Sequence, residues 1–175
     1  MLRLISIVFF AACVFSACVG GKTNDPNATP NEKQRAEALE FALTVVAAYF
    51  QTDCGDDYLA FYDDRIFALD GDGAIDKKDI ATQLCERKTR ALRDKSKTFA
   101  QYTLDYEPMI LTRSEYEQEM GKIDYPYYTA QNSDLLFVGS FRRHDNGNPD
   151  YIFDDMFVFM LRKIGKNWRI IGVNG

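Results

Sequence analysis

The feature that most constrains this chain is its C-terminal stretch, which has the pattern of two long strands joined by a tight turn. Aromatic, β-branched and methionine residues dominate Tyr151 to Leu161, as is typical of a strand buried on both faces. The short polar break Ile164 to Asn167 contains a glycine and predicts a hairpin, after which Trp168 to Val173 returns as the second strand. Because a two-stranded ribbon is not stable alone in water, the preceding segments must cover it.

The size, composition and charge of the chain fit one folded domain. The chain has 175 residues, of which 46% are hydrophobic and 14% are aromatic, and this composition is typical of a packed core rather than of a disordered segment. The formal net charge is −5, and the lysines and arginines are scattered among acidic residues. Because nucleic-acid-binding domains concentrate their basic residues, this pattern argues against a nucleic-acid partner.

The N-terminus has the pattern of an export signal. One positive residue, Arg3, precedes an apolar run that ends in small residues at Ala17. Cys18 follows directly, and the stretch Phe15 to Cys18 (F-S-A-C) resembles the lipobox of bacterial lipoprotein precursors. The resemblance implies a signal peptide over residues 1–17. It also implies that Cys18 carries acyl chains such as palmitate, which anchor the protein to a membrane of the cell envelope, on its periplasmic or surface side.

The leader leaves other interpretations open. Phe10 to Cys13 forms a second possible box with a shorter signal, and an ordinary secreted protein or an uncleaved anchor would also fit these letters. Lys22 to Thr29 is polar and lacks apolar periodicity, which predicts a flexible spacer. We therefore expect a lipidated N-terminus and tether over residues 18–29 and a single domain over residues 30–175.

Three helices are predicted in the first half of the domain. Apolar residues recur at helical spacing from Pro30 to Thr52, and Thr29 is the expected cap. Asp56 to Asp63 predicts a short second helix, and a brief strand follows at Arg65 to Leu69. The third helix is expected after a glycine-rich turn, with Asp76 as its cap.

Strands are predicted in the second half. Phe99 to Arg113 alternates as a half-buried strand does, with Pro108 at an edge or bulge. Asp134 to Arg143 is a second strand, and the turn His144 to Pro149 leads into the closing pair. Between them, Ser114 to Ser133 is polar and tyrosine-rich, and we expect an excursion or long loop with at most one short strand.

This order of elements resembles the nuclear-transport-factor-2-like superfamily. The resemblance rests on the long first helix, the short helix at Tyr58 to Tyr62, the Asp-Gly turn before Lys77 to Ile80, and Gly165 to Ile170 near the end. It implies an α+β fold, in which three N-terminal helices pack on a strongly curved antiparallel sheet to form a cone with an apolar pocket. Members of the superfamily include ketosteroid isomerase, ligand binders and interaction modules, so the fold does not give the function.

The expected pocket is apolar and rimmed by tyrosines. Its candidate residues are aromatic side chains of the second helix and of the strands: Tyr58, Tyr62, Tyr102, Tyr106, Phe157 and Phe159. Asp154 and Asp155 lie within the apolar closing stretch, so one of them is expected to point inward. The isomerase branch uses Tyr and Asp, which makes these aspartates, with Tyr58 and Tyr62, the alternative catalytic set. The favoured interpretation is structural, with the inward aspartate paired to Arg142 or Arg162.

Metal and cofactor sites are not predicted. Aligning Gly73 with the invariant glycine of an EF-hand loop puts aspartates at four ligand positions, but position 1 is Ala68 and position 12 lacks glutamate. A turn followed by a helix cap explains the same aspartates, which are Asp70, Asp72, Asp76 and Asp79. The single histidine, His144, falls in a predicted surface turn, and no zinc cluster or catalytic triad can be assembled.

A disulfide and a dimer are the remaining structural questions. Lipidation at Cys18 leaves Cys54 and Cys85 as the cysteines of the mature chain, and because an exported protein meets oxidising conditions we predict that they form a disulfide. Both faces of Tyr151 to Leu161 are apolar, so each must be covered. A homodimer through the sheet and cover by Ser114 to Ser133 explain this equally well.

The sequence therefore predicts a membrane-anchored extracytoplasmic protein, whose domain is a non-catalytic module that binds a small apolar ligand or a protein partner. The alternative is a cofactor-independent isomerase, dehydratase or cyclase of the ketosteroid-isomerase type. The two are distinguished by whether Asp154 or Asp155 faces the cavity without a cation beside it.

Overall fold

The computed structural model describes residues 25–51, 56–69, 73–80, 82, 83, 86, 98–123, 129–143 and 147–174. Its helices are α1 (Glu32–Gln51), α2 (Asp56–Leu59) and α4 (Arg113–Met120), with a 3-10 turn η1 (Phe99–Gln101). Its strands are β1 (Tyr62–Ala68), β2 (Ala74–Asp76), β3 (Tyr102–Leu104), β4 (Met109–Thr112), β5 (Leu135–Gly139), β6 (Phe141–Arg143), β7 (Asp150–Tyr151), β8 (Phe157–Ile164) and β9 (Asn167–Asn174).

Several predictions from the sequence lie outside the described residues. They are the signal peptide, the lipidation site, the disulfide cysteines, the histidine and two turn aspartates, namely residues 1–17, Cys18, Cys54, Cys85, His144, Asp70 and Asp72. Within the part of the chain that the structure describes, no helix is both long enough and apolar enough to cross a membrane.

The long helix α1 confirms the predicted first helix. Its small and β-branched residues Ala38, Ala42 and Val45 are fully buried against the sheet. The predicted cap was wrong by two residues. The backbone N–H of Gln34 donates to Asn31 Oδ1 at 3.0 Å, and the Asn31 N–H donates to Gln34 Oε1 at 2.9 Å. This reciprocal pair is a capping box that ends the extended lead-in at Asn31.

The second helix is shorter than predicted. It ends at Leu59, and Tyr62 already begins β1, which runs parallel to β9 with Tyr62 opposite Ile170. Pairing with a buried strand overrides the local helical pattern here. Residues 77–80, 82, 83 and 86 are helical, as expected of the third helix.

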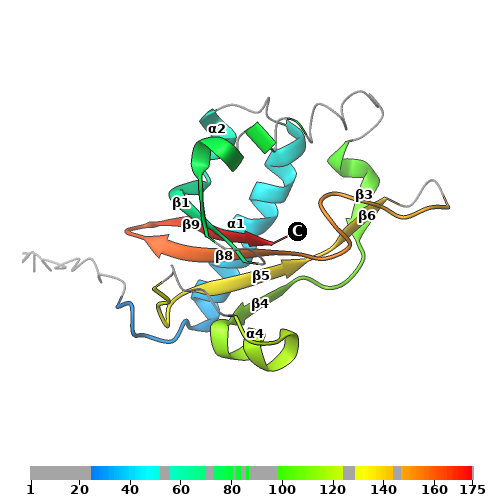
Figure 1. Ribbon diagram of the computed structural model, residues 1–175. Helices are drawn as coiled ribbons and strands as arrows, with labels where there is room; N and C mark the ends of the chain where they lie inside the picture. The colour runs from blue at the N-terminus through cyan, green and yellow to red at the C-terminus, as the bar shows by residue number, and fades with distance from the viewer. Residues whose placement is uncertain are drawn as a thin grey trace, which may run out of the picture.

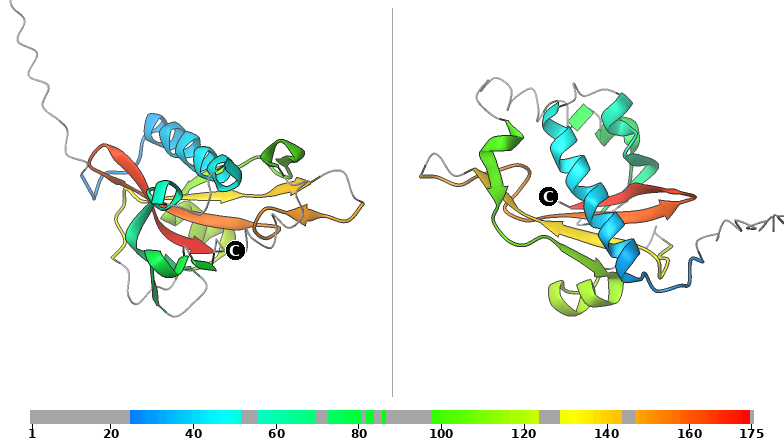
Figure 2. Two further views of the ribbon diagram at one scale, coloured as in Figure 1. Left: turned by 90° about the horizontal axis from the view of Figure 1, so that it is seen from above. Right: turned by 180° about the vertical axis from the view of Figure 1, so that it is seen from behind.

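Six strands form one sheet in the order β2-β1-β9-β8-β5-β4. The closing hairpin is confirmed, because β8 and β9 pair antiparallel from Val158 to the tight turn that joins Ile164 to Asn167. Gly165 begins that turn at φ 64°, a backbone angle that favours glycine. The sheet is curved, and α1 lies across one of its faces (Figures 1 and 2). The predicted α+β class is confirmed.

The two long predicted strands are each broken. Phe99 to Arg113 divides into η1, β3 and β4, with Pro108 in the break, and Asp134 to Arg143 divides at Ser140 into β5 and β6. The pieces β3, β6 and β7 form a separate three-stranded sheet. Because Arg143 pairs with Asp150, the predicted hairpin between these strands is confirmed.

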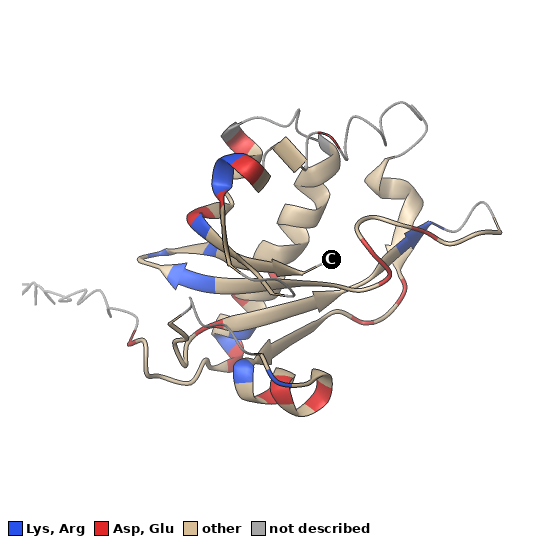
Figure 3. Ribbon diagram, viewed as in Figure 1, with Lys and Arg blue, Asp and Glu red and all other residues tan. Residues whose placement is uncertain are grey.

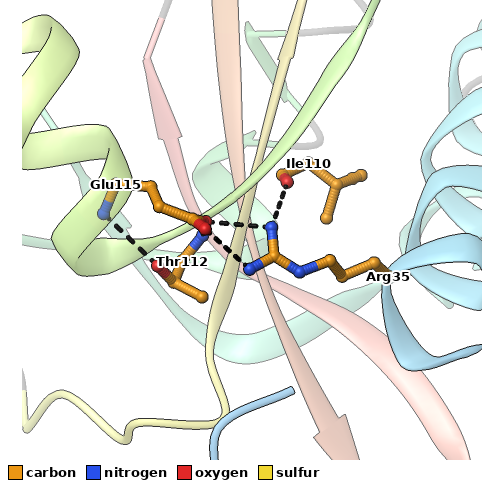
Figure 4. A network of polar contacts seen from close by, with 4 residues as sticks. All are labelled: Arg35, Ile110, Thr112 and Glu115. Carbon is orange, nitrogen blue, oxygen red and sulfur yellow. Dashed lines mark hydrogen bonds and ion pairs between the residues drawn. The ribbon is translucent and has the colours of Figure 1, made fainter. Parts of the chain in front are cut away.

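The Ser114–Ser133 region contains a helix, α4, that the sequence prediction missed. Thr112 accepts a hydrogen bond from the Glu115 N–H at 3.3 Å, and Glu115 accepts one from the Thr112 N–H at 2.7 Å. Arg35 of α1 holds the same glutamate in a two-point ion pair at 2.8 and 2.9 Å and also donates to the Ile110 carbonyl (Figure 4). The capping box and Arg35 together fix α4 beside β4.

The sheet has two buried faces, which we call inner and outer. The inner face packs on α1 and is rich in aromatic side chains, among them Phe137, Phe157 and Phe159. The outer face is aliphatic and packs on Ile123 and Tyr116 of the α4 region; its buried residues are Leu136, Val138, Val158, Met160 and Ile171. All five are at most 4% exposed in the single chain. Cover by the excursion is therefore sufficient, and the outer face does not require a dimer.

Candidate ligand-binding site

A continuous series of aromatic contacts runs through the inner face. Tyr62 contacts Tyr58, which contacts Tyr49 of α1, with ring centroids 5.6 and 6.0 Å apart. Tyr49 contacts Phe153 at 5.1 Å, and Phe153 contacts Phe157 at 4.6 Å. A side branch from Tyr49 through Phe50 reaches Tyr102, and Phe157 contacts Phe159. Five of the six predicted pocket residues are thus joined: Tyr58, Tyr62, Tyr102, Phe157 and Phe159.

The sixth predicted pocket residue, Tyr106, lies outside this network. It is 62% exposed in the bend after β3, and its place on the rim of the pocket stays a prediction. The residues that bridge the network, Tyr49, Phe50 and Phe153, were not predicted as site residues. Tyr49 carried a usable signal, because it falls on the apolar stripe of the first helix. Phe153 carried one too, because strand alternation puts it on the same face of the closing stretch as Phe157 and Phe159. In the structure it lies in the bend at 152–156, and its ring contacts Tyr49.

Two tyrosine hydroxyls meet at the buried end of the network. The hydroxyl oxygens of Tyr58 and Tyr62 are 3.2 Å apart, and both residues are at most 4% exposed. Burial raises the pKa of Tyr62 above its ordinary value, while the hydrogen bond with Tyr58 opposes this rise. The two phenols provide polar hydrogen-bonding groups among apolar rings.

A row of polar side chains lies at the other end, on the three-stranded sheet. Tyr102 of β3 is opposite Arg143 of β6, which is opposite Asp150 of β7. The Tyr102 hydroxyl donates to Asp150 Oδ2 at 3.4 Å, and Arg143 is only 7% exposed. Burial, followed by the negative charge of Asp150, raises the pKa of Tyr102 to about 12. This row supplies a hydroxyl, a cation and a carboxylate beside the aromatic network.

A small cavity of about 190 Å³ lies against this row. Arg142, Arg143 and the hairpin residues Gly147, Asn148 and Pro149 line it. Gly147 has φ 66°, and a side chain added there would meet open space, so the glycine serves the turn rather than the cavity. Two guanidinium groups and a side-chain amide give this cavity a polar, donor-rich lining.

The predicted catalytic carboxylates are not in the interior. Residues 152–156 form bends rather than the start of the closing strand, and Asp154 and Asp155 are both exposed. The prediction that one of them points inward is therefore wrong. Strand alternation was assumed to begin at Tyr151, but the register with β5 and β9 begins only at Phe157 and Val158.

A buried carboxylate does lie at the other end of β8, next to Arg162: it is Asp134, which the sequence analysis did not single out. It is 2% exposed and receives Arg162 Nε at 2.7 Å and Nη2 at 2.8 Å. Arg142 pairs instead with Asp105 at 3.2 Å. Arg142 and Arg162 were the predicted partners of an inward-pointing Asp154 or Asp155. Each arginine does pair with an aspartate, but the aspartates are Asp105 and Asp134. A bidentate pair of this kind is structural, because both carboxylate oxygens are occupied by the guanidinium.

The described residues contain no group of three or more potential metal ligands. Asp76 ends β2 and is exposed, and Asp79 lies exposed in the helix that follows. The chemistry available on the inner face is therefore that of aromatic surface, phenol hydroxyls, one buried guanidinium and one carboxylate.

Comparison with known proteins finds similarity only in structure. No protein-family model matches the chain, and no curated protein matches its sequence. A protein of unknown function with a cystatin-like fold from Nostoc punctiforme is 14% identical, with a TM-score of 0.46, over 84% of this chain and 92% of that one. An NTF-2-like protein of unknown function from Shewanella oneidensis is 15% identical, with a TM-score of 0.42, over 79% and 95%. The beta subunit of benzoate 1,2-dioxygenase from Burkholderia mallei is 10% identical, with a TM-score of 0.46, over 79% and 87%.

Proposed function

We propose that this chain is an extracytoplasmic protein held to a membrane by lipid on Cys18, and that its domain binds rather than catalyses. The occupant of the domain would be a small apolar ligand or an apolar segment of a partner protein. The anchor rests on the lipobox-like Phe15 to Cys18. The binding role rests on the aromatic network of the inner face.

One observation carries the preference for binding. The aromatic network ends in phenol hydroxyls, while the carboxylates expected to act as a base, Asp154 and Asp155, are exposed on a bend. Catalysis on this face would need a base placed over one substrate atom. Apolar lining with a few polar groups is what a ligand pocket requires.

A second candidate function rests on Asp150. It is the carboxylate that contacts an inner-face tyrosine, through the 3.4 Å bond from Tyr102. A carboxylate beside a phenol can in principle move a proton on a bound substrate, as the isomerase alternative requires. Arg143 lies opposite Asp150, and a carboxylate with a cation beside it is less available to act as a base, so we rank this function second.

The anchor is tested by metabolic labelling with an alkyne-bearing fatty acid. Wild-type chain should be labelled and recovered with membranes, and Cys18→Ala should lose both the label and membrane recovery. Cys13→Ala is the matched control and should behave as wild type. A Cys18→Ala chain that is labelled as strongly as wild type refutes the anchor.

Binding and catalysis are separated by one set of variants. Thermal unfolding of the detergent-purified chain is followed by the fluorescence of Trp168, with a panel of small aromatic and aliphatic carboxylic acids and esters. The same compounds are assayed for turnover by mass spectrometry. We expect ligand-induced stabilisation that Tyr102→Phe weakens, and no product. Product formed by wild type and abolished by Asp150→Asn, with folding intact, favours the enzyme instead.

A further inference from the structure

We propose that the end of the domain bearing the β8–β9 hairpin rests on the anionic surface of the membrane that holds the chain. This inference rests on the proposed anchor at Cys18 and adds an orientation to it. The occupant of the surface is a bilayer of anionic lipids. The docking surface comprises Arg162, Ile164, Lys166 and Arg169, and we call it the hairpin patch.

The hairpin patch combines charge with an exposed apolar side chain. The eight residues from Arg162 to Arg169 contain four basic residues and no acidic one, in a chain whose net charge is −5. Ile164 is 46% exposed beside the turn. Figure 3 shows the basic residues gathered along this end of β8 and β9. Cations around an exposed isoleucine suit a layer of anionic headgroups over acyl chains.

Three members of the patch, Arg162, Ile164 and Arg169, share one face of the hairpin, and Lys166 lies in the turn. Arg162 and Arg169 are directly opposite each other, and Ile164 is opposite Asn167. Strand alternation from the outer-face residue Met160 puts Arg162 and Ile164 on that same outer face. Asp134 already pairs with Arg162, so Arg169 is the cation of this cross-strand pair that a layer of anions would neutralise.

Part of this charge remains available to a partner. Asp134 pairs with Arg162, and Glu37 of α1 pairs with Lys163 on the inner face. Among the described residues, no carboxylate lies within ion-pair distance of Lys166 or Arg169. The acidic residues of the adjacent β1 are Asp63 and Asp64, of which Asp64 lies 3.8 Å from Lys77. Lys166 and Arg169 therefore supply the attraction.

The place where the chain enters the domain also supports this orientation toward the membrane. The first described segment, 25–31, lies at the same end of the molecule as the β8–β9 turn in every view, and the 150–156 segment lies at the opposite end (Figures 1 and 2). Asn132 donates to the Asn27 carbonyl at 3.3 Å, and Ser133 donates to the Pro26 carbonyl at 3.4 Å. These bonds hold the entry segment against the turn that precedes β5.

The tether is short relative to the domain. The seven Cα–Cα steps from Cys18 to Asp25 reach at most about 25 Å when fully extended. A domain of about 150 residues has a radius of gyration of roughly 15 Å, and its full width is more than twice that. An anchor at Cys18 therefore keeps the entry end toward the bilayer, where the hairpin patch meets the headgroups.

The test uses the full-length lipidated protein in nanodiscs with isotope-labelled isoleucine and methionine methyl groups. One set of discs is neutral phosphatidylcholine, and the other contains 30% phosphatidylglycerol. A trace of lipid with a gadolinium chelate on its headgroup broadens nearby methyl signals. Met156 is the matched probe, because it is 45% exposed against 46% for Ile164 and lies in the segment at the opposite end.

We expect the anionic discs to broaden Ile164 several-fold more than the neutral discs, with little change at Met156. Replacing two cations in Lys166→Gln/Arg169→Gln should lower the ratio of docked to undocked protein about 25-fold, at about fivefold per cation, and 0.5 M salt should do the same. The control Lys78→Gln removes an exposed cation from the third helix and should change nothing.

Equal broadening of Ile164 in neutral and anionic discs overturns the orientation, because the tether alone would then account for proximity. Intact mass of the same sample separates the two proposals. A chain without lipid refutes the anchor and this inference with it. A lipidated chain in which the broadening of the Ile164 signal does not depend on lipid charge refutes this inference alone.

Discussion

The two faces of the six-stranded sheet are buried by different means. The inner face is aromatic, is covered by the 20-residue α1, and includes tyrosine hydroxyls from α2, β1 and β3. The outer face is aliphatic and is covered by the eight-residue α4 and Ile123. Both faces are buried, but the inner one has several tyrosine hydroxyls within its packing, whereas the outer one is mainly aliphatic, with Tyr116 packed against it.

This difference teaches which face to test for function. Aliphatic side chains under a short helix perform one task, the exclusion of water. Aromatic rings with hydroxyls offer in addition the flat surfaces and directed hydrogen bonds that recognise a ligand. Variants on the outer face should change stability alone, and variants on the inner face should change stability and binding separately.

The largest effect is expected from Phe157→Ala. Phe157 is 1% exposed and contacts Phe137, Phe141, Phe153 and Phe159, so removing its ring should lower the free energy of unfolding by about 4 kcal/mol. Leu136→Ala on the outer face should lower it by about 3 kcal/mol. Urea unfolding measures both. An outer-face variant that also abolishes ligand-induced stabilisation would break the distinction between the faces.

Asp134→Ala should be the next most damaging change. It removes the buried partner of Arg162, whose Nη2 also donates to the Thr129 carbonyl at 2.9 Å, and so leaves the guanidinium without its counter-charge. We expect a loss of about 3 kcal/mol. A double-mutant cycle with Arg162→Ala isolates the pair, and a coupling energy near zero would show that the two side chains act independently.

Glu115→Gln should cost about 1 kcal/mol, since the side chain is 41% exposed and solvent screens its ion pair. Arg35, followed by the Thr112 N–H, lowers the pKa of Glu115 to about 2 from an ordinary 4.5. A lowered pKa stabilises the fold above the ordinary value, and this stability is lost as the pH falls toward 2. Unfolding measured from pH 6 to pH 2 should therefore show wild type approaching Glu115→Gln. A constant gap between them would contradict the shift.

Tyr62→Phe should change stability by less than about 1 kcal/mol, because it deletes one hydrogen bond between hydroxyls. If the inner face is the binding face, the same change should weaken ligand-induced stabilisation by more than it weakens the fold. Thermal unfolding with and without the best compound of the panel gives both numbers. An unchanged ligand response would remove Tyr62 from the proposed site.

The smallest effect is expected from Asp154→Asn and Asp155→Asn. Both side chains are exposed, so each change should stay within about 0.5 kcal/mol of wild type. Any turnover found in the compound panel should be unaffected. A clear loss of stability or of turnover in either variant would restore the inward carboxylate that the sequence predicted.

Local rules made the long elements predictable. Apolar spacing over more than five turns specified α1, and the glycine turn between two apolar runs specified β8 and β9. The alternation of Phe157 to Leu161 also assigned its aromatic residues to one face and Val158 and Met160 to the other, as the structure has them. In each case many residues follow the same spacing, so the pattern identifies the element.

Short elements depended on their surroundings. The apolar residues near Tyr62 fit a helix or a strand, and the parallel partner β9 decided for the strand. α4 has few apolar residues, so periodicity missed it, although Thr112 and Glu115 spell a capping box. A capping box marks only where a helix can begin. The position of α4 against the domain also depends on the ion pair between Glu115 and Arg35, which is 80 residues away in the sequence.

The candidate site also has features that the local sequence predicts and features that only tertiary contacts determine. The sequence alone determined that the interior would be aromatic and tyrosine-rich, because aromatic residues recur on one face of the closing stretch and along the apolar stripe of the first helix. Only the tertiary structure decided which carboxylate is buried. Asp134, Asp154 and Asp155 all adjoin apolar runs, and the bend at 152–156 exposes the last two while β8 brings Arg162 to the first. Burial of a charge depends on a counter-charge arriving from elsewhere in the chain, and no local pattern encodes that.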